Sequence, residues 1–521
     1  LCARRSYSWA RLRQQACFTC GLCAVISQHM ASTIPWLRLL PWLTAALPFV
    51  FVAVRGFPAG DDWQLELARI AQYLEALRDA QWPPFWAPSL YAGHGSPLFL
   101  FYGHTFLALS GAAALAAGSC GLGYLLALAA ASACGVVWTQ RLGAAWVRGT
   151  AEDNARGGRI AAYLYLASPY LLADMLLRNA AAEFTALCCL PLALYGCLAV
   201  ARAQRGGVLV LAAAAALVLV SHVLVALMLC VLLLLLGAAL MITPRPLLES
   251  SSEEGEQRPQ LRSRAALVRQ LVCAGLLGLA LAAFHALPLA VYRSWLDASE
   301  LVRGKFEYAA QLGSLARVFD PGAAHAAGLL PLVIAVAAVP ALWWRALAPR
   351  ALNAALLAGV CLFSLLQTPL ARPFLAALPW LAYLQFPFRC NGPLALCAAL
   401  LGSGLLSPLM AARSARSKPL LELGVWLVCV LATWPQLART STLSWSEVAR
   451  FEALLEPAQM RRTLVTATVL DEYLPYGARR SAVRAPAQAE PVLSPRRHVD
   501  IAGAAARLAI RGGEPRRLSV V

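Results

Sequence analysis

The sequence predicts an all-α, polytopic membrane protein that carries a small β-rich region after its last span. Of its 521 residues, 60% are hydrophobic and 13% are charged, whereas soluble domains carry about 25% charged residues. Uncharged runs close to the roughly 20 residues needed to cross a bilayer recur from Trp36 to Ala438. Arginines separate these runs, a pattern typical of loops that fix membrane topology. An ordinary soluble enzyme is therefore excluded.

The uncharged runs predict about 11–13 transmembrane helices. The predicted spans, each with at most one charged residue, are 36–54, 98–118, 120–140, 160–177, 184–201, 207–241, 266–289, 327–346, 351–368, 391–411 and 419–437. The 207–241 run contains no Asp, Glu, Lys or Arg, and a single helix of that length would measure about 50 Å. Because this exceeds the thickness of the hydrocarbon core, we expect the run to break near Ser221-His222.

The net charge of +18 comes mainly from arginines beside the spans, so it predicts topology and not nucleic-acid binding. Arginine-bearing segments should lie in the cytoplasm: 2–38, 202–205, 245–269, 345–350 and 413–418. The opposite side then holds 55–97, 290–326, 385–389 and everything after 438. One conflict remains, because two full crossings between 98 and 140 leave the arginine-bearing 141–159 loop outside. The number of crossings is also even, so one predicted span is wrong or re-entrant.

The N-terminal segment is predicted to stand apart from the membrane domain. Residues 1–29 are interpreted as a leader or a non-native upstream segment, because the chain begins at Leu1 and Met30 precedes the first span. The spacing Cys17-x-x-Cys20-x-x-Cys23 resembles a metal or cluster site. We nevertheless expect no metal site in this segment.

The rest of the chain divides into two predicted parts. Residues 30–438 form the transmembrane domain, with a large first outside loop at 55–97. Residues 439–521 form an extracytoplasmic region, in which the alternating run at 462–469 is typical of β strands. A truncated β-rich domain is one interpretation of this region.

The first outside loop contains a predicted amphipathic helix. Its apolar residues recur at helical spacing: Leu67, Ile70, Leu74 and Leu77. Polar residues share another face: Asp62, Glu66, Arg69 and Tyr73. We expect this helix to lie on the membrane surface. The pair Asp61-Asp62 precedes it and has two interpretations, a helix N-cap, which the spacing favours, or a catalytic carboxylate.

Five motifs, taken in order, resemble a known family. The run from Asp61 to Tyr102, with its Gly93-His94-Gly95-Ser96-Pro97 turn, resembles bacterial membrane proteins named 6-pyruvoyl-tetrahydropterin synthase-related. These proteins are similar to the C-type (GT-C) superfamily of glycosyltransferases, which use lipid-phosphate sugar donors. The later motifs are Ser168-Pro169-Tyr170 with Arg178-Asn179-Ala180-Ala181-Ala182-Glu183, then Ser221-His222, Gln385-Phe386-Pro387-Phe388-Arg389 and Asp471-Glu472-Tyr473-Leu474-Pro475. The sequence departs from the family at Asn179, Phe388 and Glu66, where the family has Gly, Trp and often His.

The resemblance implies a glycosyltransferase with a GT-C-like fold at the outer face of the bacterial cytoplasmic membrane. Asp62 or Asp61 would deprotonate an acceptor hydroxyl, and Arg178 and Arg389 would bind the phosphate of a polyprenyl-phosphate-linked sugar. The acceptor would be an envelope glycan, lipid or protein. The other candidate site residues are Glu66, Arg69, His94, His104, Glu183, His222, Gln385, Glu472 and Tyr473. No cofactor is expected with certainty, although a divalent metal near His94 and His104 is an open alternative.

Several of these residues also have purely structural interpretations. Arg178 and Glu183 can form an ion pair, and His222 can be a buried hydrogen-bonding residue. Arg389 can extend its guanidinium from a helix broken at Pro387 to the membrane interface. Two other functions also remain open: a transporter or flippase of lipid-linked glycans with a site at the membrane midplane, and a non-catalytic envelope scaffold.

Overall fold

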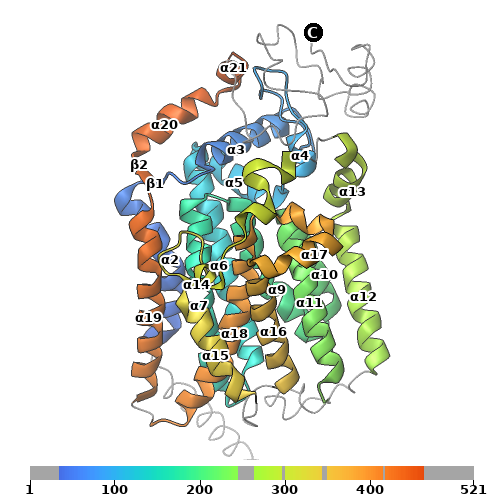
Figure 1. Ribbon diagram of the computed structural model, residues 1–521. Coiled ribbons are helices and arrows are strands. Elements are labelled where there is room, and N and C mark those ends of the chain that lie inside the picture. Colours follow the sequence, from blue (N-terminus) through green and yellow to red (C-terminus); the bar gives the residue numbers. More distant parts are fainter. Residues whose placement is uncertain (1–34, 245–262, 296–299, 343–348, 415–416, 463–521) are drawn as a thin grey trace, which may run out of the picture.

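The computed structural model describes residues 35–244, 263–295, 300–342, 349–414 and 417–462. The predicted leader at 1–29, the candidates Glu472 and Tyr473 and nearly all of the predicted β-rich run lie outside the described residues. Figure 1 shows long helices running side by side, with short helices and turns gathered at one end. We call this the loop end, which carries α3 (Trp63–Arg78), α4 (Leu98–Phe101) and α20 (Trp445–Leu454).

Apolar helices make up the body of the molecule. They are α2 (Leu40–Arg55), α5 (His104–Ala117), α6 (Cys120–Trp146), α7 (Ala151–Leu166), α9 (Ala181–Ala201), α10 (Gly207–Ser221), α11 (Val223–Ile242), α12 (Arg264–Leu281), α13 (Ala283–Tyr292), α15 (Leu329–Ala341), α16 (Arg350–Leu365), α18 (Asn391–Ala411) and α19 (Ser417–Arg439).

Shorter elements connect these helices. The short α-helices are α8 (Pro169–Leu172), α14 (Leu315–Phe319), α17 (Arg372–Ala377) and α21 (Pro457–Met460), and η2 (Ala173–Leu177) is a π-helical turn. The 3₁₀ turns are η1 (Pro35–Leu39), η4 (Arg293–Trp295), η5 (Glu300–Val302), η6 (Gly304–Phe306), η7 (Tyr308–Gln311), η8 (Pro369–Ala371), η9 (Pro379–Leu384) and η10 (Pro387–Cys390). Strands β1 (Phe57–Pro58) and β2 (Thr442–Leu443) pair antiparallel, with Phe57 opposite Leu443.

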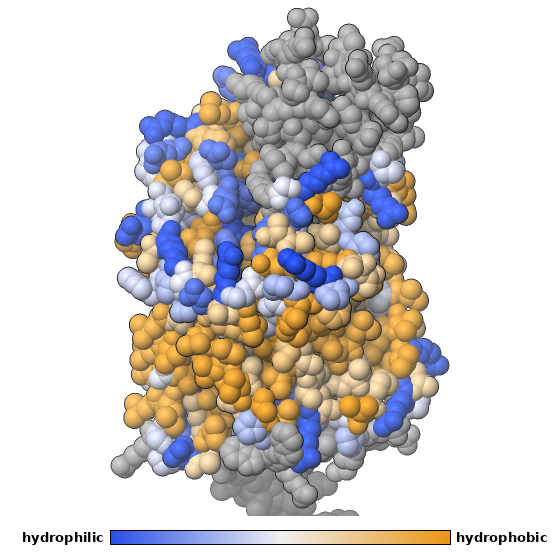
Figure 2. All heavy atoms as spheres, in the orientation of Figure 1, coloured by the Kyte–Doolittle hydropathy of each residue, from blue (hydrophilic) through white to orange (hydrophobic). Residues whose placement is uncertain are grey.

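The structure confirms a mostly helical, multi-span membrane protein. Among the described residues, seven helices are long and apolar enough to cross a membrane, and up to nine spans result if two bent helix pairs each count as one. Those pairs are α7 with α8 and η2, bent by 50°, and α16 with η8 and α17, bent by 99°. This count is lower than the predicted 11–13, because α5, α10, α13 and α15 are apolar but shorter. Figure 2 shows a broad apolar band over the lower half of one face of the molecule.

The predicted break in the 207–241 run is confirmed. Helix α10 ends at Ser221 and α11 begins at Val223, and His222 between them has an extended backbone with φ −161° and ψ 112°. The imidazole Nδ1 of His222 accepts a hydrogen bond from the Val225 amide at 3.3 Å. His222 therefore caps the second helix as well as separating it from the first.

The prediction of a full crossing at 98–118 is wrong. Helix α5 has 14 residues and measures about 21 Å, less than the hydrocarbon core of about 30 Å. Its first residue, His104, has its ring 6.0 Å from that of Tyr73 in α3, and the Ser119 hydroxyl just beyond its last turn donates to Glu452 of α20 at 2.9 Å. Both ends of α5 thus lie at the loop end, and part of this apolar helix is exposed, including Leu109 and Leu115.

This correction removes the conflict in the predicted topology. Helix α6 now starts at the loop end and finishes at Trp146, whose indole nitrogen donates to Asn353 of α16 at 3.3 Å. The Arg202 guanidinium donates to the carbonyl of Ala145. The 141–159 loop therefore lies with the arginine-bearing segments around 202 and 350, and the number of predicted crossings becomes odd.

A cysteine-labelling experiment tests this topology. In a cysteine-free background, Ala151→Cys and Gln64→Cys, both at exposed positions, should react with a membrane-impermeant maleimide from opposite sides of the membrane. Arg205→Cys, also exposed, should label from the same side as Ala151→Cys and serves as the reference. Labelling of Ala151→Cys and Gln64→Cys from one side would contradict the placement of α5.

The amphipathic helix of the first loop is confirmed as α3, and other parts of the protein cover its polar residues. Its polar residues are enclosed: Glu66 is 0% exposed and Arg69 is 4% exposed. On another side of the helix, the Glu75 carboxylate pairs with Arg461 at 2.9 Å, just after α21. Segments far apart in the sequence therefore cover both sides of α3, and helical periodicity alone does not reveal such contacts.

Candidate functional site

A cavity of about 1290 Å³ opens among the helices below α3. Its walls come from the loop before α3, the segment around Tyr102, the start of α9, the junction of α10 and α11, and helices α12 and α13. The predicted site residues that line it are Asp61, Asp62, Arg69, Arg178, Glu183, His222, Gln385 and Arg389. Residues from distant parts of the sequence thus meet in one space.

The two aspartates are positioned by a backbone ladder. The amide of Asp61 donates to the carbonyl of Leu177, and the amide of Asp62 donates to that of Arg178, both at 2.9 Å. The amide of Gly60 donates to the Asn179 side chain at 2.6 Å. Asn179 has φ +54°, a conformation that glycine adopts easily and that Asn tolerates. The departure from the family's Gly at 179 is therefore compatible with the same backbone.

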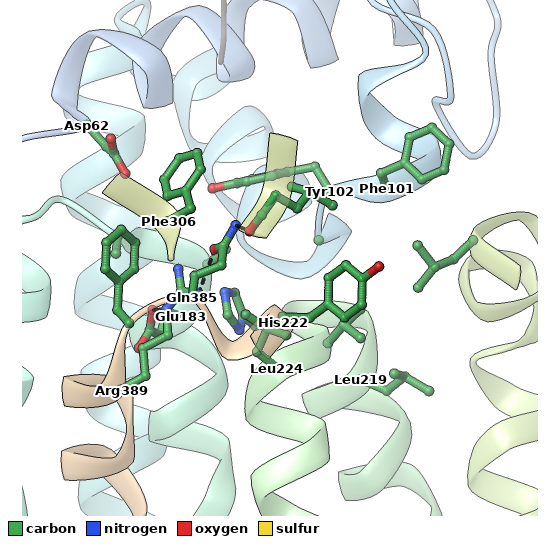
Figure 3. Close-up of a pocket in the computed structure, with 18 of the residues that line it drawn as sticks. Asp62, Phe101, Tyr102, Glu183, Leu219, His222, Leu224, Phe306, Gln385 and Arg389 are labelled. Atoms are coloured by element: carbon green, nitrogen blue, oxygen red, sulfur yellow. Dashed lines mark hydrogen bonds and ion pairs between the residues drawn. The ribbon is translucent and has the colours of Figure 1, made fainter. Parts of the chain in front are cut away.

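The N-cap interpretation of Asp62 is wrong. Asp62 occupies the N-cap position of α3, but its side chain accepts no capping hydrogen bond. The half-buried carboxylate lines the cavity instead, and Figure 3 shows it on the opposite side from Glu183 and Arg389. It is therefore placed to meet a ligand.

Gly60 is expected to be intolerant of a side chain. A Cβ at this position would lie 2.2 Å from Asn179 Oδ1 and 2.3 Å from the carbonyl oxygen of Leu177. Gly60→Ala should therefore cost about 1–3 kcal/mol, as overpacking does elsewhere, and lower the thermal midpoint in detergent. Gly424→Ala in α19, where a Cβ would meet nothing within 4 Å, should leave the midpoint unchanged or raise it. Equal midpoints for the two variants would contradict the close packing of 60 on 177–179.

Arg178 and Arg389 lie close together at one end of the cavity. The Glu183 carboxylate lies 3.1 Å from Arg178 and 3.0 Å from Arg389, so it bridges them. Arg178 also pairs with Asp174, and Tyr170 donates its hydroxyl to Glu183 at 2.6 Å. The predicted ion pair of Arg178 with Glu183 is present, and it belongs to a cluster of two formal positive and two formal negative charges. All four charged side chains of this cluster are buried.

Aromatic rings form a stack beside this charged cluster. The rings of Phe386 and Phe388 are 5.0 Å apart at an interplanar angle of 15°, and His325 stacks on Phe388 at 4.5 Å and 28°. The guanidinium carbon of Arg178 lies 5.1 Å from the centre of Phe388, and that of Arg389 lies 5.0 Å from Phe386. Phe388 thus provides the flat ring that the family's Trp would provide, and cation–π contacts hold both arginines.

Gln385 has a strained backbone at the start of this segment. Its φ is +63°, which is uncommon for a residue other than glycine and is concentrated at functional sites. Its side-chain oxygen accepts from Arg389 Nη1 at 2.9 Å, and its amide nitrogen donates to the carbonyl of Leu301 at 3.2 Å. The helix break before Pro387 therefore orients Arg389 into the cavity and does not send it outward to the membrane interface.

Glu66 lies outside the cavity and binds two residues that line it. Tyr102 donates to Glu66 Oε1 at 2.5 Å, and Arg69 Nη1 donates to both Glu66 Oε1 at 2.8 Å and the Tyr102 oxygen at 2.9 Å. Arg69 and Tyr102 line the cavity, whereas Glu66 does not. Burial raises the pKa of Glu66, against the opposing effect of Arg69. Burial also raises the pKa of Tyr102, so the phenol remains protonated and can donate.

The three candidate histidines do not share one place in the structure. His222 lines the cavity, but His94 and His104 do not. The ring of His104 lies 5.3 Å from that of His285 in α13, away from the aspartates. Within the described ranges, no three His, Cys, Asp or Glu residues are arranged to hold a metal ion. Among the described residues, His94 and His104 therefore do not join the carboxylates in a group of metal ligands.

The remainder of the cavity is mostly apolar, apart from Arg293 and Ser294 just beyond α13. Its lining there comes from α10 to α13: Leu219, Val223, Leu224, Leu279, Ala286, Leu289 and Ala290. Figure 3 shows Leu219 and Leu224 on the side away from Asp62. The cavity therefore combines a charged end with an apolar end, and suits a ligand with both characters.

Some lining or supporting residues were not predicted from the sequence. Asp174 lies inside a run that was read as apolar, although its position four residues before Arg178 is a signal for an ion pair. Tyr102 ends the run from Asp61 to Tyr102, but the sequence predicts no role for it. His325 had no sequence signal at all, because it lies in a loop without a motif.

No protein-family model matches the sequence, and no curated protein matches it. Solved structures do resemble it. The oligosaccharyltransferase of Archaeoglobus fulgidus, tethered with an acceptor peptide, has a TM-score of 0.48 at 14% identity, over 85% of this chain and 61% of that chain. ArnT from Cupriavidus metallidurans, bound to undecaprenyl phosphate, has a TM-score of 0.43 at 14% identity, over 82% of this chain and 76% of that chain.

A second structure of the archaeal oligosaccharyltransferase, with an inhibitory peptide and a dolichol-phosphate, has a TM-score of 0.44 at 12% identity and covers 83% of this chain. This chain spans less than two thirds of the archaeal protein. The pterin-related family name finds no support in a family match. These likenesses are distant and concern the fold alone.

Proposed function

We propose that this protein transfers a sugar from a polyprenyl-phosphate-linked donor to a hydroxyl group of a cell-envelope acceptor. One observation carries the proposal: the uncapped carboxylate of Asp62 shares a cavity with Arg178 and Arg389, and the same cavity continues into an apolar end. A base, a cationic cluster and an apolar channel are the three parts that such a reaction needs.

The two ends of the cavity suit the two parts of the donor. The apolar lining from α10 to α13 suits a polyprenyl chain, whose burial is favourable in proportion to its apolar area. The guanidinium groups of Arg178 and Arg389 suit the phosphate, because arginine pairs with phosphate oxygens through directed N–H groups. The sugar would then lie between the phosphate and Asp62.

The chemistry requires one base and no general acid. Asp62 takes the proton of the acceptor hydroxyl, and the acceptor oxygen forms a bond to the anomeric carbon. The bond between that carbon and the phosphate oxygen breaks, and the phosphate keeps the electron pair. Since phosphate departs as a stable anion, the second carboxylic acid that glycosidases use to protonate an alkoxide is not needed. Asp61, on the same loop, is the alternative base.

The acceptor approaches from the loop end in this proposal. Asp61 is exposed there, and Asp62 is half-buried at the edge of the cavity. We place this end at the outer face of the cytoplasmic membrane, where an envelope glycan, lipid or protein would supply the hydroxyl. The arginine-bearing loops at the other end support this orientation.

Reconstitution tests the proposal. The purified protein in nanodiscs, given synthetic undecaprenyl-phosphate sugars and an envelope extract, should release undecaprenyl phosphate and label an acceptor. Cells that lack the protein should lose one glycan. Movement of the intact lipid-linked sugar across proteoliposome membranes without release of undecaprenyl phosphate would instead favour the transporter. Neither release nor movement with any donor would favour the scaffold.

A further inference from the structure

His325 occupies a fixed place in the cavity wall. It lies in the loop between α14 and α15 and lines the cavity. Its ring stacks on Phe388, and its backbone carbonyl accepts a hydrogen bond from the Asn391 side chain at 2.8 Å. Asn391 in turn accepts from Gln367 at 2.7 Å. The backbone of His325 is therefore held by the buried Asn391 and its ring by the partly buried Phe388.

The two ring nitrogens of His325 have different surroundings. Nδ1 is enclosed and has no hydrogen-bond partner among the described residues, whereas Nε2 is not enclosed. Burial lowers the pKa of His325 to about 4, and the nearby Arg178 acts in the same direction. The imidazole is therefore neutral at pH 7 and carries a single N–H. An enclosed N–H without a partner is rarer than an enclosed acceptor, so the proton belongs on Nε2 of this cavity-lining side chain.

The charged cluster beside His325 has no uncompensated cation for a phosphate, so an additional neutral donor would help to bind it. Arg178 and Arg389 are already compensated by Asp174 and Glu183. A phosphate that enters this end of the cavity must compete with those carboxylates for the two guanidinium groups. A neutral N–H has no acidic partner to give up, and it can stabilise negative charge without prior reorganisation.

We infer that His325 binds the phosphate of the lipid donor through Nε2–H and stabilises the phosphate as it departs. The inference rests on the proposed function. Negative charge grows on the phosphate oxygen while its bond to the anomeric carbon breaks, and a donor already fixed in place stabilises that growing charge more than the ground state. The stack on Phe388 fixes the donor in place.

Three substitutions separate this role from simple packing. His325→Phe keeps a flat ring on Phe388 but removes the N–H, and His325→Gln restores an N–H donor without the ring. His94→Phe is the matched control, because His94 does not line the cavity. The probes are undecaprenyl phosphate and undecaprenol, which differ only in the phosphate, and binding to nanodisc-embedded protein is followed by tryptophan fluorescence.

His325→Phe should weaken undecaprenyl phosphate binding about tenfold, as loss of a hydrogen bond to a charged group does. It should lower kcat for sugar transfer by roughly 100-fold, as loss of an oxyanion donor does. His325→Gln should recover part of both, and His94→Phe should bind as the wild type does. Undecaprenol should bind equally well to all four proteins.

Two results would overturn the inference. One is a wild-type Kd for undecaprenyl phosphate in His325→Phe, and the other is an equal loss of undecaprenol binding, which would show that His325 acts only through packing. A different result would contradict the proposed function while leaving this inference intact. If the wild type binds undecaprenyl phosphate and His325→Phe weakens it, but no donor sugar is ever transferred, the phosphate contact stands without the transferase activity.

Discussion

Asp62→Asn is expected to lower kcat for sugar transfer by roughly 10²–10⁴-fold, the usual contribution of a general base, while the protein folds normally. Asn has the shape of Asp but accepts no proton at neutral pH. No capping hydrogen bond is lost, because the Asp62 side chain makes none. The KM for the donor should change little, since the acceptor proton is transferred only in the transition state. Initial rates with an undecaprenyl-phosphate sugar measure kcat and KM separately.

The control for this variant lies on the same helix. Asp79→Asn removes a half-buried carboxylate at the C-terminal end of α3, outside the cavity, and should keep the wild-type rate. Asp61→Asn identifies the base: if Asp61→Asn loses the rate while Asp62→Asn keeps it, Asp61 is the base. If both variants transfer sugar at the wild-type rate, neither aspartate is the base and the proposed chemistry is wrong.

Much of the helical architecture could be predicted from the sequence, because a bilayer imposes a strong requirement on length and charge. The uncharged 207–241 run was too long for one crossing, and its break at His222 followed from that length. The 98–118 run failed because hydrophobicity does not show that the chain turns at Gly103 and leaves a helix of only 14 residues. Its turn at Gly103, where a Cβ would lie 1.9 Å from the Ser221 carbonyl oxygen, depends on a contact with a distant helix.

The candidate site could be predicted where a charge interrupts an apolar chain. Asp62, Arg178, Glu183 and Arg389 stood out for this reason, and the cavity brings them together. The capping of α3 could not be decided, because side-chain rotamers at an N-cap are set by tertiary contacts. His325 could not be found either, since its importance comes from stacking on Phe388, a residue 63 positions away in the printed sequence.

The bridging carboxylate of Glu183 allows a prediction with opposite effects on binding and on stability. Glu183→Gln removes one of the two negative charges that compensate Arg178 and Arg389. Breaking a buried ion pair by removing one partner costs roughly 3–5 kcal/mol, so the thermal midpoint should fall sharply. The two freed guanidinium groups should nevertheless bind undecaprenyl phosphate about tenfold more tightly, because an anion no longer competes for them. A ligand that binds the folded state tightly should also restore much of the midpoint.

Glu422→Gln is the matched control for this prediction. Glu422 is 1% exposed and accepts from Arg159 at 2.5 Å and from Tyr163 at 2.8 Å, in a buried ion cluster between α7 and α19 away from the cavity. Its substitution should lower the midpoint as Glu183→Gln does, but it should leave undecaprenyl phosphate binding unchanged, and the ligand should stabilise this variant only as much as the wild type. If Glu183→Gln binds undecaprenyl phosphate more weakly than the wild type, the arginines do not form the phosphate site. If Glu422→Gln also tightens binding, the effect is general to the fold and not specific to the bridge between Arg178 and Arg389.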